Sequence, residues 1–226
     1  MKVQKNALLL ISGGFDSPVA GKLAQEKGYL LKAIHFSQEP FTDNSAEKKA
    51  LQLCKLLGIK EMITIDAGEM LKEITDKTYR EYYFILMKRF FMKVSERIAE
   101  LEDCEFLVTG ESIGQVSSQT ISNLNNINNA TKIEILRPLI FMKKQDIIDL
   151  SKKFGFYETC IGKELCDALA TGKPKTHSKT RKVLEEENKC EMEKLVKRAL
   201  EKVRKEKTEN TNLEKEKTQG KSICKR

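Results

Sequence analysis

The first apolar run of the chain is followed at once by a glycine-rich turn and a helical pattern, and this order constrains the fold most. Residues 8–11 are continuously apolar, which predicts a buried strand, while Ser12, Gly13 and Gly14 predict a tight turn. Pro18 suits the first turn of a helix. A strand–turn–helix unit of this kind directs backbone N–H groups and the positive end of the helix toward one point. The segment therefore predicts a phosphate-binding loop.

This loop differs from two common nucleotide-binding motifs. It has neither the Gly-Lys-Ser/Thr of a Walker A loop nor a Gly-x-Gly-x-x-Gly pattern. Ser12 and Ser17 can add hydroxyl donors to the backbone N–H groups. Asp16 suits Mg²⁺, or the orientation of a pyrophosphate, because a carboxylate beside phosphates needs a cation. The alternative is an ordinary strand–helix turn built from small residues.

Apolar strands alternate with helical patterns along most of the chain. This alternation predicts an α/β fold with a doubly wound parallel sheet of about five strands. In the helix expected over 82–101, the aromatic residues and methionines should pack in the core, while Lys88, Arg89 and Arg97 should project. Residues 123–131 are rich in Asn and predict irregular structure. Besides the first strand we expect strands at 29–36, 59–65, 105–110 and 133–138, and further helices at 17–27, 45–57, 68–78 and 143–154.

Two strand ends carry candidate nucleotide-binding residues. His35 and Phe36 fall at the carboxyl end of the second strand, where a doubly wound sheet binds its ligand, and there they could meet adenine and ribose. A buried core histidine would fit the same position. Residues 110–120 hold two glycines, two glutamines and four hydroxyl side chains, which could bind an adenine edge or a ribose. A capping loop of small residues is the alternative.

The net charge of +8 is concentrated near the C-terminus. Residues 189–226 contain thirteen Lys or Arg against seven Glu, so this tail is the electrostatic candidate for contact with nucleic acid. A solvated charged helix is the alternative. We expect a nucleotide-binding domain at 1–182 with a cysteine-bearing basic loop near 155–182. A basic amphipathic helix should follow at 183–207, and a disordered tail at 208–226.

Six scattered cysteines, with neither a signal peptide nor a membrane-spanning stretch, predict a reducing, cytoplasmic setting and no membrane partner. Cys54 is expected in the core.

Three segments together resemble one family. Residues 12–17 resemble the PP-loop of the N-type ATP pyrophosphatases. The combination is similar to the ATP-pyrophosphatase domain of the ThiI family, and it consists of this loop, residues 110–119, Leu136-Arg-Pro-Leu139 and Lys144. Members of the family are tRNA sulfurtransferases that make 4-thiouridine, and the resemblance covers roughly residues 5–205. It implies that Asp16 and Lys144 serve adenylation. It also implies ATP contacts at Leu10, Ile11, Ser12, Gly13, Gly14, Ser17, His35, Phe36, Lys88, Gly110, Gln115 and Gln119.

The resemblance implies a two-step reaction, in which a uridine oxygen of tRNA is adenylated with Mg²⁺-ATP and then replaced by sulfur. The sulfur would come from a persulfide protein, from sulfide or from a cluster. Cys166 aligns best with the family's cysteine and lies near Lys163 and Lys173, whose charge would favour a thiolate. Cys160 is the second candidate. The two cysteines could form a transient disulfide, ligate an iron–sulfur cluster, or be spectators.

Two departures from the family leave other functions open. The chain opens at the first expected strand, so neither a THUMP region nor a rhodanese domain is expected, and the interval before Pro174 is longer than in the bacterial form. Transfer RNA would then be bound through the basic tail, a second copy in a homodimer or a separate subunit. The alternatives are a PP-loop enzyme that adenylates a small metabolite or another RNA base, and a non-catalytic nucleotide- or RNA-binding partner of a longer homologue.

Overall fold

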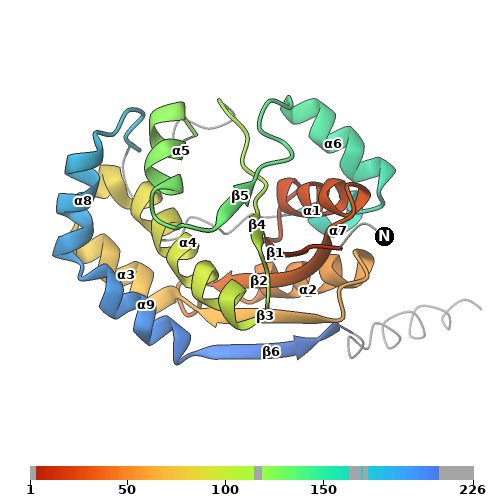
Figure 1. Ribbon diagram of the computed structural model, residues 1–226, viewed down its shortest axis with the longest axis horizontal. Helices are drawn as coiled ribbons and strands as arrows, with labels where there is room; N and C mark the ends of the chain where they lie inside the picture. The colour runs from red at the N-terminus through yellow and green to blue at the C-terminus, as the bar shows by residue number, and fades with distance from the viewer. Residues whose placement is uncertain (1–3, 115–118, 163–168, 170–172, 209–226) are drawn as a thin grey trace, which may run out of the picture.

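The computed structural model describes residues 4–114, 119–162, 169 and 173–208, which form a sheet covered by helices on both faces (Figure 1). The strand order is β5-β4-β1-β2-β3-β6, and the first five strands are all parallel. The strands are β1 Asn6–Leu10, β2 Leu30–Ser37, β3 Glu61–Asp66, β4 Phe106–Val108, β5 Glu134–Leu136 and β6 Val203–Lys207. The predicted doubly wound α/β fold is therefore confirmed.

Both faces of the sheet are apolar because both are covered, which explains the unbroken apolar run at residues 8–11. Leu8 packs into one core cluster, whereas its neighbours Ala7 and Leu9 pack into the other. Such alternation follows from the two-residue period of a strand.

The helices divide between these two cores. The first core is covered by α3 Gly68–Lys77, α4 Tyr83–Leu101, α5 Ile121–Asn128, α8 Thr180–Lys189 and α9 Met192–Leu200. The second is covered by α1 Asp16–Glu26, α2 Ser45–Leu56, α6 Lys144–Lys153 and α7 Tyr157–Cys160. A short 3-10 helix, η1 Arg80–Tyr82, precedes α4. Among the described residues, no helix combines the length and the apolar composition needed to cross a membrane.

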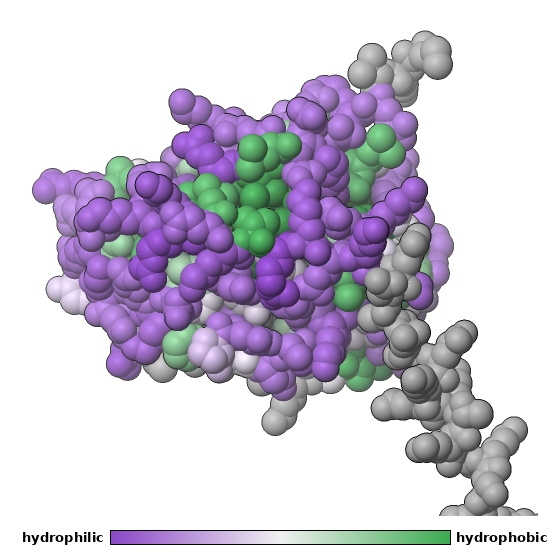
Figure 2. All heavy atoms as spheres, turned by 90° about the horizontal axis from the view of Figure 1, so that it is seen from below, coloured by the Kyte–Doolittle hydropathy of each residue, from purple (hydrophilic) through white to green (hydrophobic). Residues whose placement is uncertain are grey.

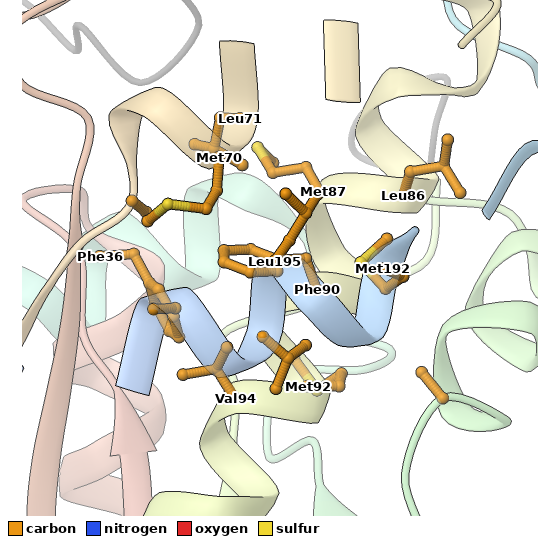
Figure 3. Packing of buried hydrophobic residues seen from close by; sticks show 14 of the residues in the cluster. Phe36, Met70, Leu71, Leu86, Met87, Phe90, Met92, Val94, Met192 and Leu195 are labelled. Atoms are coloured by element: carbon orange, nitrogen blue, oxygen red, sulfur yellow. The ribbon is translucent and has the colours of Figure 1, made fainter. Parts of the chain in front are cut away.

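The larger core lies around α4. Phe90 of α4 and Leu195 of α9 lie at its centre, with Met70 of α3 and Phe36 of β2 beside them (Figure 3). The aromatic and methionine residues of α4 are therefore core residues, as the sequence predicts. Cys54 is also buried in a core, as expected.

The C-terminal segment differs from the expected single helix over 183–207. Glu191 has a positive φ of 51°, which interrupts the helical path between α8 and α9. After α9 the chain extends into β6, whose backbone pairs antiparallel with β3 from Val203 to Lys207. The edge of β3 that faces away from β2 has backbone N–H and C=O groups that need partners. Pairing with them outweighs the helical propensity of residues 203–207.

Two local predictions were also wrong. Residues 123–131 are not irregular throughout, because α5 occupies 121–128, with the Thr120 side chain accepting a hydrogen bond at its start. Arg89 does not project from α4. It is buried, where it donates to the Glu187 carboxylate and to the backbone oxygen of Asn126. Burial of this pair joins α4 to α8.

The strand order also fixes where a ligand can bind. The chain proceeds from β1 to β2 on one side, and β4 lies on the other side of β1. The sheet order therefore reverses between β1 and β4, and the loops that leave their carboxyl ends diverge there. In open α/β sheets this switch point is the usual ligand site.

Candidate functional site

The loop after β1 is held against the first turn of α1 by two serines. The Ser12 backbone N–H donates to Ser17 Oγ (2.9 Å), and the two hydroxyl oxygens are 3.2 Å apart. The Gly14 N–H donates to Ser12 Oγ (3.3 Å). The loop therefore folds as a compact turn at the amino end of α1, as its proposed phosphate-binding role requires.

Gly110 brings the motif after β4 into contact with this loop. A Cβ atom at this position would lie 2.7 Å from the Asp16 carbonyl carbon and 2.7 Å from the Ser17 nitrogen. Both of these atoms are backbone atoms, so no side chain could move aside to make room. Only glycine allows the two motifs to pack this closely.

Asp16 forms an ion pair with Lys144, and this contact unites two distant sequence motifs. Lys144 Nζ lies 2.8 Å from Asp16 Oδ1, although the residues are 128 positions apart. Asp16 opens α1 and Lys144 opens α6, so both helix starts meet at the carboxyl ends of the strands. Both side chains are partly exposed and can be reached by a ligand from solvent.

Glu111 is the most strongly buried charged group of the site. Its carboxylate accepts from Lys88 Nζ (2.8 Å) and from Arg137 Nε (2.9 Å), and Thr109 Oγ1 donates to it (3.3 Å). Burial alone would raise the pKa of Glu111, but the two cations outweigh burial and hold the pKa below its ordinary value. Arg137 Nη2 is buried without a hydrogen-bond partner among the described residues. The carboxylate thus fixes two cations beside Gly110, and one of them keeps an unused donor.

Glu111 and Arg137 lie within the motifs that the sequence pointed to, yet neither was assigned a role. The available signal was a charged residue near the carboxyl end of each of two strands: Arg137 follows β5 at once, and Glu111 comes three residues after β4.

His35 and Phe36 both lie near the loop, but both are buried. His35 Nδ1 is 3.0 Å from the Ile11 backbone oxygen, and burial lowers the pKa of the imidazole, which favours the neutral ring. Phe36 stacks on Phe91 of α4, with ring centroids 4.1 Å apart. Leu10 and Ile11 connect β1 to the loop. Leu10, Ile11 and His35 therefore hold the start of the loop in place. Contact of these residues or of Phe36 with adenine stays a prediction.

Gln119 contributes an unused acceptor. Its backbone oxygen accepts from the Gly114 N–H (3.0 Å), whereas its side-chain Oε1 is buried without a partner in the described part of the chain. A buried acceptor without a partner costs free energy unless a ligand or water supplies a donor. Gln115 lies outside the described residues.

Cys160 lies directly behind the loop. Its side chain is 1% exposed, and its thiol donates to the Gly14 backbone oxygen (3.6 Å). Lys49 of α2, which the sequence reading missed, donates to the Cys160 backbone oxygen (3.4 Å) and packs 3.2 Å from the position of a Cβ on Gly13. Cys166 lies outside the described residues. A sulfur-carrying role for either cysteine stays a prediction.

No group of three or more His, Cys, Asp or Glu side chains is placed to hold a metal ion within residues 4–114, 119–162 and 173–208. The predicted iron–sulfur cluster involves Cys166 and is therefore not tested. A single carboxylate such as Asp16, beside a loop suited to phosphates, does fit Mg²⁺, which protein sites commonly hold through one carboxylate and the substrate phosphates.

The described part of the basic tail is largely neutralised by internal ion pairs. Arg204 binds Glu47 and Asp66, with nitrogen–oxygen distances of 3.0 and 2.9 Å, and Lys202 binds Glu69 at 2.7 Å. These groups line a cavity of about 480 Å³ beyond β3, where carboxylates outnumber cations. Figure 2 shows the molecule from below Figure 1, the side on which β6 lies. This face is largely hydrophilic, with an apolar patch near its centre. Pairing of this kind weakens the expectation that residues 198–207 bind nucleic acid.

Comparison with known proteins gives consistent matches. A family model described as "Thiamine biosynthesis protein (ThiI)" matches residues 2–192. A probable tRNA sulfurtransferase of Alkaliphilus oremlandii is 45% identical over 201 residues, which cover 86% of this chain and 51% of that protein. One of Oceanobacillus iheyensis is 42% identical over 184 residues, covering 78% and 46%. The chain thus spans about half the length of these relatives.

Solved structures match in the same way. A crystal structure of a 4-thiouridine synthetase–RNA complex with bound ATP superimposes with a TM-score of 0.85 and 30% identity, covering 90% of this chain and 55% of that one. An NMN synthetase from Francisella tularensis, at 18% identity and a TM-score of 0.51, shares the fold alone.

Proposed function

This chain belongs to the ThiI family, and from that premise we propose that it uses ATP to activate a uridine of tRNA for replacement of its carbonyl oxygen by sulfur. In the first step the uridine oxygen attacks the α-phosphorus of ATP and pyrophosphate leaves. In the second step sulfur attacks the adenylated carbon and AMP leaves. Adenylation is needed because a carbonyl oxygen is a poor leaving group, whereas AMP is a good one.

The observation that carries this proposal is the convergence of three distant motifs at the switch point of the sheet. Lys144 meets Asp16 at 2.8 Å, and Gly110 packs on the backbone of the loop. This arrangement suits a nucleotide whose phosphates lie at the loop and at the start of α1. The likeness to a synthetase solved with RNA and ATP supports the same placement.

Positive charge at the site would stabilise the developing pyrophosphate. The loop N–H groups, Lys144 and Lys88 would offset negative charge on the phosphate oxygens as the bond to the α-phosphorus breaks. Lys88 is available for this because Glu111 holds it at the site, at 2.8 Å. When bound, Mg²⁺ would be held by Asp16 and would add charge neutralisation of the same kind.

The sulfur step rests on the cysteine-bearing segment. Cys166 would carry the sulfur as a persulfide, received from a persulfide protein whose thiol is released. Its outer sulfur would attack the adenylated carbon, and Cys160, its partner or substitute, would then cleave the sulfur–sulfur bond and leave a Cys160–Cys166 disulfide. Free sulfide, as the alternative donor, would attack the adenylated carbon directly without a cysteine carrier. Transfer RNA would be bound with help from a second copy of the chain or from a separate subunit. The roles of the two cysteines follow the family resemblance of the sequence.

The first test is release of AMP and pyrophosphate from Mg²⁺-ATP, measured with and without unmodified tRNA. We expect release that depends on tRNA. Asp16→Ala should abolish it, while Lys153→Ala, at the far end of α6 from Lys144, should leave it unchanged. Circular dichroism of both variants would show that the fold is intact.

Other outcomes would replace this proposal by the alternatives. Release of AMP without tRNA would indicate a small-molecule substrate. Binding of ATP without turnover, under any RNA tested, would indicate a non-catalytic partner of a longer homologue. Cys166→Ala should keep tRNA-dependent AMP formation and lose 4-thiouridine, detected by nucleoside mass spectrometry; unchanged thiolation would exclude the sulfur-carrying role.

A further inference from the structure

Phe141 is an aromatic side chain left almost wholly in solvent beside the candidate site. It is 85% exposed, the highest value among the exposed large apolar side chains of the described residues. It lies in the turn between β5 and α6, three residues before Lys144. Single exposed apolar side chains are common on protein surfaces, and what sets Phe141 apart is its place in a firmly held turn beside the Asp16–Lys144 pair.

The turn that carries Phe141 is firmly held. The Met142 N–H donates to the Leu139 oxygen (2.9 Å), and the Ile113 N–H donates to the Ile140 oxygen (2.9 Å). Ser112 Oγ donates to the Met142 oxygen (3.0 Å). Leu139 itself is fully buried. The backbone on both sides of the ring is thus bonded to the motif that begins at Gly110, and the exposure of Phe141 is a fixed feature of the turn.

The surroundings of Phe141 combine apolar and positive character. Lys143 and Lys144 follow it after Met142, and Lys144 Nζ lies 2.8 Å from Asp16 Oδ1. A second exposed apolar side chain, Ile121, which is 72% exposed, opens α5 two residues after Gln119, whose backbone oxygen accepts from the Gly114 N–H. An exposed aromatic ring with cations beside it can bind an unpaired nucleotide through both its base and its phosphate.

We propose that Phe141 stacks on an unpaired base of the RNA substrate, next to the nucleotide that enters the site. This inference rests on the proposed function, because it assigns a specific contact to the RNA. Lys143 would meet the adjoining phosphate. The stack would fix the approach of the strand to the Asp16–Lys144 pair while leaving ATP binding to the loop.

Tryptophan fluorescence tests the contact directly. The chain contains no Trp and five Tyr, so Phe141→Trp creates a single tryptophan that can be excited selectively at its red absorption edge. Titration with unmodified tRNA should quench it. Leu101→Trp is the matched control, because Leu101 is 76% exposed at the end of α4, beside the amino ends of the strands. Equal quenching of both variants, or of neither, would overturn the proposal.

Kinetics separate this contact from the proposed function as a whole. Phe141→Ala should raise the KM for tRNA by about 5- to 150-fold, the range found when one stacked base is lost, and should change the KM for ATP less than twofold. Phe141→Tyr should restore the KM for tRNA. If the KM for tRNA stays the same while AMP release still depends on tRNA, the stacking contact is wrong and the proposed function stands. If the unsubstituted protein itself shows no tRNA-dependent release, both are wrong.

Discussion

Substitution of Glu111 by Gln tests how the site holds its positive charge. The substitution preserves the shape of the side chain but removes the charge that faces both Lys88 and Arg137. All three side chains are at least four-fifths buried, with exposed fractions of 8%, 19% and 13%. The variant would leave two cations close together with no anion between them, while an amide can satisfy only one of the two donors.

The expected loss of stability is about 3 kcal/mol, at the lower end of the range for removing one partner of a buried ion pair. For a domain of this size it corresponds to a fall in Tm of about 6–12 °C. The loss should depend on pH with a definite sign. The pKa of Glu111 is lowered in the folded protein. Its contribution to the free energy of unfolding is therefore complete above the pKa of the unfolded chain, about 4.3, and disappears as pH falls through the folded pKa.

Urea unfolding followed by circular dichroism, at pH 7 and again below pH 4, measures this difference. Glu105→Gln is the matched control, because Glu105 pairs with Lys5 at 3.5 Å and both side chains are about half exposed. That variant should lose less than about 1 kcal/mol. If both variants lose the same small amount at pH 7, or if the loss for Glu111→Gln does not shrink in acid, the buried carboxylate does not organise the two cations.

Three further predictions follow from single features of the fold. Gly110→Ala should lower the free energy of unfolding by about 1–3 kcal/mol through overpacking. It should also raise the KM for ATP, because the new Cβ would displace the start of α1. Thermal unfolding and steady-state kinetics test these two effects, and an unchanged Tm would contradict the close contact. Burial raises the pKa of Cys54 to about 12 and those of Cys104 and Cys190 to about 11, so iodoacetamide at pH 7.5 should label none of them in the folded protein, as peptide mass spectrometry can check. Burial lowers the pKa of His35, so the free energy of unfolding should fall as pH drops below about 6.5. In urea unfolding at a series of pH values, His35→Asn should reduce this fall, and the same pH dependence in both proteins would contradict the prediction.

The sequence predicts the parallel sheet and its ligand-binding loops because these depend on local order. Residues 8–18 already contain the apolar run, the turn and the helix start, and the structure adds only their packing. Gly110 was found as a motif residue, but its steric reason appears only when the backbone of Asp16 is placed against it.

Other features depend on partners far along the chain and could not be predicted locally. Asn123 and Asn126 suggest a loop by composition, yet their side chains donate to the backbone oxygens of Lys175 and Ser178, at 2.8 and 3.0 Å, and so belong to a helix. Arg89 has the spacing of an exposed residue, and only the arrival of Glu187 on α8 explains its burial. Tertiary hydrogen bonds outweigh propensity in both cases.

The antiparallel strand β6 has a consequence for the solubility of any shortened chain. Without it, β3 would present open backbone N–H and C=O groups next to the apolar side chains of Met62, Ile63 and Ile65, which is the usual template for intermolecular β-pairing and aggregation. The charged residues Arg204 and Lys205 of β6 discourage such pairing on the outer side. The family match ends at residue 192, before this strand. A protein trimmed to that match would keep the nucleotide-binding motifs, but it would lose the strand that covers the edge of β3 and, with α9, the core residue Leu195.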